Sequence, residues 1–202
     1  MSRLYIPGLF AAMLVSTSAQ AGTYTLGGKL YIQVFKDPDT LGAGLSHDHV
    51  MVAQNWTGSA TYDSADPSGC NISITVPVSN LDVDPDYMRQ AVGYDTLLSE
   101  GQRDDVRTNM LAASQLNADA HPNISFQSTS CTASSVSGNL TIRGSTQPVT
   151  MQATIEEDGS QFSLRGQLSI RATQFGFQPY SAMLGQLKNR DDMTLTVRVS
   201  NQ

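Results

Sequence analysis

The chain has 202 residues, with 18 acidic side chains against 12 basic ones and a formal net charge of −6. An acidic excess argues against a nucleic-acid partner, because contact with a phosphate backbone requires clusters of lysine and arginine. It also argues against docking on an anionic membrane surface. Beyond the N-terminal segment, no stretch approaches the about 20 apolar residues that span a bilayer, so we expect no stable membrane insertion.

The N-terminus carries the features of an export signal. Arg3 precedes an apolar run over residues 4–15, and Ala19-Gln20-Ala21 supplies the small-x-small pattern that signal peptidase cleaves. A membrane anchor is the alternative, but the run is too short for one. We therefore predict a signal peptide over residues 1–21 and one mature domain over residues 22–202, located in the periplasm or secreted by a bacterium.

Apolar side chains recur at every second position through most of the mature chain. This period is typical of β-strands with one dry and one wet face. Turn signals rich in Gly, Ser and Asp separate the runs, which indicates a barrel or a sandwich. The runs are Leu30, Ile32, Val34; Ile72, Ile74, Val76, Val78; Leu140, Ile142; Val149, Met151, Ala153, Ile155; Phe162, Leu164, Leu168, Ile170; and Leu195, Val197, Val199.

The β pattern lapses between residues 85 and 116. Residues 87–92 and 103–111 are predicted to form short helical pieces there. Because this is the only long insertion between strands, we expect it to cover one end of the sheet structure. Its apolar side chains are then expected to face the interior: Met88, Val92, Met110 and Leu111.

An acidic stretch precedes these helical pieces. Asp82, Asp84 and Asp86 alternate in the manner of a calcium-binding loop, but Tyr87 and Gly93 occupy the positions of the required glycine and glutamate. We therefore interpret the stretch as a solvated acidic turn.

The chain contains two cysteines, Cys70 and Cys131. In an oxidising compartment such a pair favours a disulfide, with two buried thiols as the alternative. Cys70 opens one predicted strand, and Cys131 ends the next long strand after the helical insertion. If those strands are antiparallel neighbours, the two residues lie side by side.

Ser46-His47-Asp48-His49 is the clearest candidate for polar chemistry. On an extended strand His47 and His49 face the same way, and paired imidazoles can bind zinc, copper or haem iron. His121 is the only other histidine, so a closed metal site lacks ligands. We expect His47 and His49 at a barrel rim, with any metal bound weakly and completed by water or His121. A periplasmic metal- or haem-binding module is the alternative function.

Motifs of common enzyme classes do not occur. The sequence has no G-x-S-x-G, H-E-x-x-H, phosphate-binding loop or dinucleotide fingerprint. We predict no catalytic residues and no cofactor, and interpret the protein as a binding module rather than an enzyme. A hydrolase or isomerase built in the same barrel is the third hypothesis.

Three blocks of the second half resemble the YceI-like family of exported, lipocalin-shaped proteins. In residues 116–126 a helix ends, a proline turns the chain and a strand with an aromatic begins. Residues 137–150 match the family's "G-x-L-T-(x)-x-G-x-T-x-P-V" hairpin, and residues 171–176 match its C-terminal block before the closing strand. Gln115 replaces the usual aromatic, and the segment around His47 and His49 also departs from the simplest members, as in a divergent branch.

The resemblance implies an all-β fold, an eight-stranded antiparallel lipocalin-like barrel with a short helical excursion between two strands. It also implies an elongated lumen that binds an isoprenoid-type lipid, such as a quinone tail or a prenyl chain, and a carrier role in the periplasm. The family has no fixed catalytic set. Periodicity alone leaves open whether the dry faces line such a lumen or fill a solid core. A homodimer is compatible with this interpretation.

The predicted lumen combines the alternating runs with the helical excursion. A long tail in a dry tunnel gains about 0.8 kcal/mol per buried methylene without specific polar contacts. The residues expected to line the lumen are Ile72, Ile74, Val76, Met88, Val92, Met110, Leu111, Leu140, Ile142, Val149, Met151, Phe162, Leu164, Leu195 and Val197.

Overall fold

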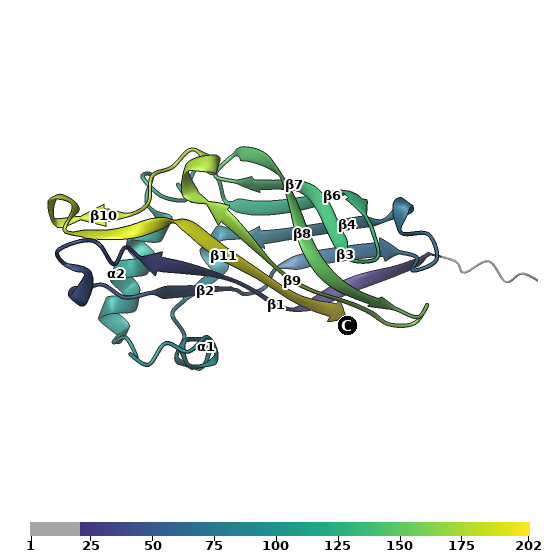
Figure 1. The fold of residues 1–202 in the computed structure, drawn as a ribbon, viewed down its shortest axis with the longest axis horizontal. Helices are drawn as coiled ribbons and strands as arrows, with labels where there is room; N and C mark the ends of the chain where they lie inside the picture. Colours follow the sequence, from purple (N-terminus) through teal and green to yellow (C-terminus); the bar gives the residue numbers. More distant parts are fainter. Residues whose placement is uncertain (1–20) are drawn as a thin grey trace, which may run out of the picture.

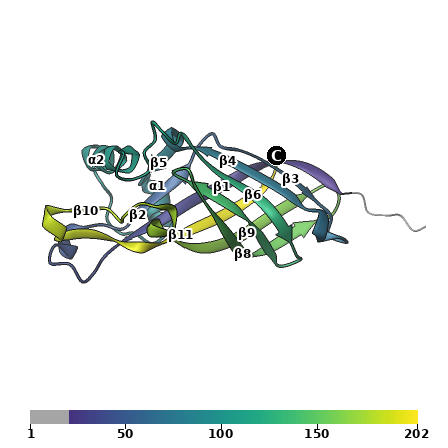
Figure 2. The same cartoon turned by 90° about the horizontal axis from the view of Figure 1, so that it is seen from above.

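The computed structural model describes residues 21–202, and most of the strands join edge to edge around a common axis (Figures 1 and 2). The predicted signal peptide lies, except for Ala21, outside the described residues. The strands are β1 (Gly22–Lys36), β2 (His49–Ala53), β3 (Thr57–Tyr62), β4 (Asn71–Pro77), β5 (Leu81–Val83), β6 (Asn123–Cys131), β7 (Ser135–Ile142), β8 (Ser145–Glu157), β9 (Phe162–Arg171), β10 (Ser181–Ala182) and β11 (Leu187–Asn201). The α-helices are α1 (Asp86–Ala91) and α2 (Glu100–Leu111).

Eight of the strands close into an antiparallel barrel in the order β1, β3, β4, β6, β7, β8, β9 and β11, with β11 returning to pair with β1. The closing seam runs from Leu26, opposite Asn201, to Lys36, opposite Asn189. Closure leaves these strands no long free edge and directs alternate side chains inward. The predicted eight-stranded lipocalin-like barrel is therefore confirmed.

The hairpin that carries the family-like block has the geometry its sequence demands. β7 and β8 are joined by Arg143 and Gly144, whose φ angles are +51° and +71°. Positive φ at both central residues is the type I′ turn that matches the twist of a β-hairpin, and glycine adopts it without strain. This turn places Leu140 and Ile142 on the inner face of the barrel.

The barrel wall splits near one end. β2 continues along the edge of β1 beyond β3, and β5 pairs with β2, whereas β4 pairs with β6 only as far as Pro77, opposite Asn123. β5 and β6 are therefore not hydrogen-bonded to each other. Helix α2 packs against β5 on this side of the barrel, so the helical excursion completes the wall where the sheet opens.

The two predicted helical pieces are confirmed as α1 and α2. α2 begins with a capping box in which Ser99 and Gln102 satisfy each other's backbone N–H groups. α1 packs against β2 on the outer face of the sheet, and Figure 1 shows it outside the barrel. Within residues 21–202, no helix is long and apolar enough to cross a membrane.

The opposite end of the barrel is filled with aromatic side chains. The rings of Tyr24 and Phe162 stack at 5.4 Å between centroids, and Tyr62 lies 5.8 Å from Phe162 in a tilted arrangement. Phe162 is 1% exposed. The Tyr24 hydroxyl donates to Glu157 at 2.7 Å, and burial and this carboxylate raise the pKa of Tyr24 to about 12. This end of the barrel is therefore closed.

The predicted disulfide is confirmed. Cys70 precedes β4 and Cys131 ends β6, which are antiparallel neighbours, and the two Cα atoms are 5.9 Å apart. The bond closes a loop that contains both helices. It stabilises the fold mainly by restricting the unfolded chain.

Candidate functional site

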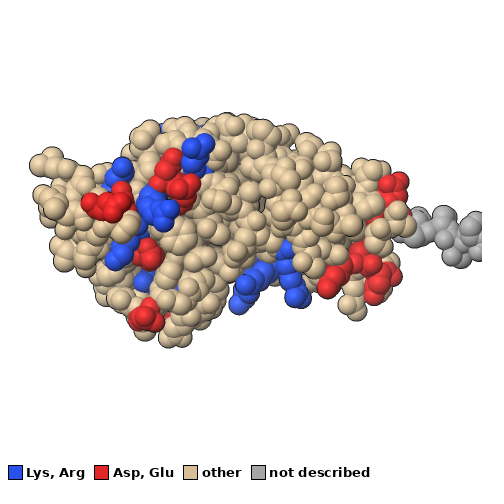
Figure 3. Space-filling view, viewed as in Figure 1, with Lys and Arg blue, Asp and Glu red and all other residues tan. Residues whose placement is uncertain are grey.

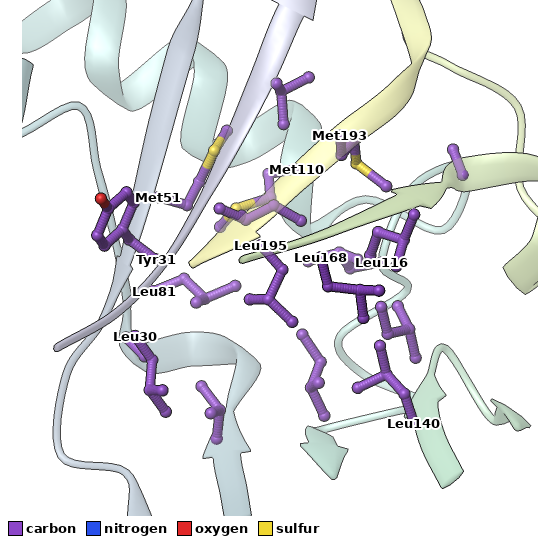
Figure 4. Close-up of a pocket in the computed structure, with 18 of the residues that line it drawn as sticks. Leu30, Tyr31, Met51, Leu81, Met110, Leu116, Leu140, Leu168, Met193 and Leu195 are labelled. Carbon is purple, nitrogen blue, oxygen red and sulfur yellow. The ribbon is translucent and has the colours of Figure 1, made fainter. Parts of the chain in front are cut away.

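An apolar cavity of about 250 Å³ occupies the barrel between the closed end and the helical side. Side chains from both sides of the barrel point into one space, as Figure 4 shows for Leu81, Leu168 and Leu195. Most of the wall is aliphatic, with the thioethers of four methionines and several aromatic rings added. The dry strand faces therefore line a cavity instead of packing into a solid core.

Most of the residues expected at the lumen border this cavity. They come from β4, β7, β8, β9, β11 and α2, which closure of the sheet brings together. The cavity-lining members of the predicted set are Ile72, Ile74, Val76, Met110, Leu140, Ile142, Val149, Met151, Leu164, Leu195 and Val197. A ligand in the cavity would contact these residues.

Met88 and Val92 do not line the cavity, and the expectation that they face the lumen is wrong. Met88 is buried against Val50 and Val52, which point to the outer face of the sheet, and Val92 packs on the same outer cluster. The helical spacing identified an apolar face of α1 correctly. It did not reveal which side of the sheet that face covers.

Leu111 and Phe162 also lie outside the cavity lining. Leu111 is half-buried against the main core at the end of α2, one residue beyond the cavity-lining Met110. Phe162 packs with the two tyrosines at the closed end. Both residues support the barrel, and neither borders the space a ligand would fill.

Several cavity residues were not in the predicted set. Leu30, Ile32 and Val34 belong to an alternating run of apolar residues in the sequence, but the predicted set does not include them. The other additional residues lie outside clear runs of alternating apolar residues or at their ends. The main aliphatic and aromatic additions are Met51, Ala53, Leu81, Val106, Leu116, Ile124, Phe126, Leu168, Ile170, Phe177 and Met193.

Polar side chains border the cavity at the end away from the closed, aromatic end of the barrel. Asn189 lies opposite Lys36 where β1 ends, and His49 lies opposite Val34 at the start of β2. These positions define the mouth of the cavity. The polar residues that border it are His49, Asn109, Gln115, Tyr180, Asn189 and Arg190.

His49 belongs to a buried ionic cluster with Asp84 and Arg89. The Nδ1 atom of His49 lies 2.6 Å from Oδ2 of Asp84, and Nη1 of Arg89 donates to Oδ1 of Asp84 at 2.7 Å. The backbone N–H of Val50 donates to the same Oδ1 at 2.9 Å. Asp84 is 0% exposed, so the interpretation of this stretch as a solvated turn is wrong for Asp84.

Arg89 connects this cluster to the surrounding loops. Its Nη1 also donates to the carbonyl of Asp48 at 2.8 Å, and its Nε donates to the carbonyl of Thr96 at 2.7 Å. Its guanidinium carbon lies 5.2 Å from the centroid of the Tyr94 ring. The two hydrogen bonds from Arg89 therefore hold the loop at Asp48 and the loop at Thr96 in a fixed position relative to each other.

Asp84 remains ionised in this setting. Burial alone would raise the pKa of the Asp84 carboxyl, but hydrogen bonds from His49, Val50 and Arg89 hold it below its usual value. An ion desolvated in this way is stable only while each partner is present.

The depressed pKa of Asp84 predicts a pH dependence of stability. The unfolded carboxyl titrates near pH 3.9, so the stabilising contribution is fully present above that pH and is lost as pH falls through the lower, folded-state pKa. Denaturant unfolding between about pH 5 and pH 3 should therefore show a steeper loss of stability in the wild-type protein than in Asp84→Asn. Equal slopes in the two proteins would contradict the assignment.

His47 lies in the loop before β2. Burial, followed by the neighbouring His49 ring and the charges of Arg89 and Lys36, lowers the pKa of His47. Within residues 21–202, no group of three or more His, Cys, Asp and Glu side chains is placed to hold a metal ion. The placement of His49 at the cavity mouth agrees with the expected rim position, but its Nδ1 is bonded to Asp84.

The structure is a lipocalin-shaped barrel with an apolar internal cavity. The YceI-like domain model matches residues 36–200, and the chain belongs to the YceI-like family. No curated protein sequence matches the chain.

Solved structures share the fold at low sequence identity. The structure is similar to BcnA of Burkholderia cenocepacia, with a TM-score of 0.60 and 13% identity, over 86% of this chain and 96% of that one. It is also similar to the YceI protein of Campylobacter jejuni, with a TM-score of 0.53 and 14% identity, over 74% of this chain and 82% of that one. These similarities establish the barrel fold.

Proposed function

We propose that the protein binds and carries an isoprenoid-type lipid, such as a prenyl chain or a quinone tail, in the barrel cavity. The observation that carries this proposal is an apolar cavity lined mainly by aliphatic side chains inside a closed barrel. Each methylene moved from water into such a space gains about 0.8 kcal/mol. The family resemblance implies the same class of ligand.

The size and softness of the cavity suit part of a flexible chain. Its volume of about 250 Å³ lies just below the usual range of small-molecule sites, which begins at about 300 Å³. Methionine side chains adapt to irregular shapes because they are unbranched and polarisable. The cavity-lining methionines are Met51, Met110, Met151 and Met193.

We also propose that the protein acts in the periplasm and has no catalytic activity. The disulfide between Cys70 and Cys131 agrees with an oxidising compartment, and the N-terminal pattern supports export to the periplasm. On the face that Figure 3 shows, the basic side chains lie in small groups, several of them beside acidic side chains, and no extended basic surface forms there. This pattern supports the proposal that the protein has no nucleic-acid partner. We propose a carrier without catalytic activity, because the cavity wall offers aliphatic contacts and its polar groups gather at the mouth.

Val149→Trp tests this proposal by filling the cavity from β8. Each methylene displaced from the cavity costs about 0.8 kcal/mol of binding, so displacing two raises the Kd of a prenyl lipid by more than about tenfold. Displacement of an apolar fluorescent probe by geranylgeraniol measures this Kd.

Thr150→Trp is the matched control, because Thr150 is the next residue on β8 and its side chain is exposed on the outer face. It should bind as the wild type does. Equal affinity in folded Val149→Trp and wild-type protein would place the ligand elsewhere. Failure of the wild type to bind any prenyl lipid would overturn the proposed function.

A further inference from the structure

The cluster of His49, Asp84 and Arg89 takes no part in the strand pairing that closes the barrel. It places an ionised carboxylate and a guanidinium, both nearly without solvent contact, directly behind one polar residue of the cavity mouth. Buried ionic groups are costly unless every hydrogen bond is made. The arrangement therefore fixes the orientation of the one member that reaches the cavity, which is His49.

The bonding of the cluster sets which ring nitrogen carries the proton. Arg89 lies 2.7 Å from Asp84 and balances its charge, so the carboxylate does not require a second cation. Nδ1 of His49 lies 2.6 Å from the other carboxylate oxygen and donates its proton there. In a neutral imidazole with hydrogen on Nδ1, Nε2 is a hydrogen-bond acceptor.

Nε2 of His49 is the nitrogen left for a ligand. Among residues 21–202, no hydrogen bond joins it to another protein group. His49 borders the cavity and is 13% exposed, while the next inward-facing residues of β2, Met51 and Ala53, continue the apolar wall. A chain lying along that wall brings its polar end to His49.

We propose that Nε2 of His49 accepts a hydrogen bond from a hydroxyl group at the polar end of the bound lipid. This inference rests on the proposed function and narrows its ligand to hydroxyl-bearing lipids, such as prenols and quinols. Quinones, esters and ethers carry only acceptors and cannot donate to Nε2. The site therefore discriminates by the presence of an O–H group at the end of the chain.

The test compares geranylgeraniol with its O-methyl ether, which keeps the chain and the oxygen but removes the donor. One hydrogen bond contributes about 0.5 to 1.5 kcal/mol, so the wild type should bind the alcohol about 2- to 13-fold more tightly. In His49→Phe, which keeps a ring but has no acceptor, this ratio should fall to about one. Affinity for squalane, a saturated isoprenoid with no oxygen, measures any change that the new ring makes to the apolar wall, and the ratio of alcohol to ether is independent of that change.

His49→Gln is the conservative variant. Its amide N–H can donate to Asp84 while its carbonyl oxygen accepts from the ligand, so part of the preference for the alcohol should return. Nitrogen NMR of labelled histidine in the wild type provides a readout that needs no variant. The Nε2 resonance of His49 should shift on addition of the alcohol at about pH 8 and should not shift with the ether.

The outcomes separate this inference from the proposed function. If the wild type binds neither the alcohol, the ether nor the hydrocarbon, the carrier function fails. If it binds the alcohol and the ether equally, the carrier function stands and His49 is not a ligand contact. A preference for the alcohol that persists in His49→Phe assigns the acceptor to another group and overturns the inference.

Discussion

Replacing Arg89 by methionine should lower the free energy of unfolding by about 3 to 5 kcal/mol, because the variant leaves a buried carboxylate without its cation. Asp84 has 0% exposure, and Arg89, at 2%, also holds the carbonyls of Asp48 and Thr96. Chemical denaturation of the purified proteins gives this difference directly.

An exposed ion pair supplies the control. Arg103 lies 3.5 Å from Asp86, and the two side chains are 33% and 54% exposed. Arg103→Met should cost less than about 1 kcal/mol, as surface pairs usually do. Adding Asp84→Asn to Arg89→Met should recover part of the loss, because the uncompensated charge is removed. If Arg89→Met is no more harmful than Arg103→Met, the ionic cluster does not stabilise the fold.

Phe162→Ala should also cost about 3 to 5 kcal/mol, the usual range for removing a large aromatic side chain from a packed core. Phe162 is 1% exposed and contacts the rings of Tyr24 and Tyr62 at the closed end of the barrel. Because it does not border the cavity, residual folded protein should keep its affinity for a prenyl lipid. Thermal or denaturant unfolding measures the first effect, and probe displacement measures the second.

Leu168→Ala is the comparison within the cavity wall. Leu168 borders the empty space, so its side chain already lacks packing partners on one side and its removal forfeits fewer contacts. Its cost should lie toward the lower end of the about 2 to 5 kcal/mol range for such truncations. A larger loss for Leu168→Ala than for Phe162→Ala would mean that the barrel is packed tightly around the cavity and loosely at its closed end.

The barrel was predictable because its strands carry a local signal. Alternation of dry and wet side chains depends only on the period of the strand, and closure then leaves the dry faces one place to meet. The disulfide was predictable for a similar reason, since Cys70 and Cys131 stand at matching ends of neighbouring strands. The family-like hairpin at Arg143 and Gly144 added a specific turn.

The position of α1 depended on information that helical spacing does not contain. Met88 and Val92 define an apolar face, but that face can cover either side of a sheet. The sequence offered one overlooked signal: residues 50–53 form a continuous apolar run, which is typical of a strand buried on both faces. Val50 and Val52 are the outward members of that run, and α1 covers them.

The ionic cluster could not be derived from spacing. Asp84 and Arg89 follow His49 by 35 and 40 positions in the numbering, and they meet it only because β5 pairs with β2. The sequence predicts an exposed Asp84, since an aspartate in an acidic stretch beside a proline is usually in a turn. Its positive φ of 50° and its complete burial become visible only in the fold.

Mass spectrometry of the bound lipid tests directly whether the barrel cavity holds a prenyl-chain lipid. The wild type, Val149→Trp and Thr150→Trp would each be incubated with a bacterial lipid extract, repurified and extracted with organic solvent. We expect a prenyl-chain lipid at close to one molecule per protein in the wild type and Thr150→Trp, and its depletion in Val149→Trp. A wild-type protein without prenyl-chain lipid, or equal amounts in Val149→Trp and the wild type, would contradict this expectation.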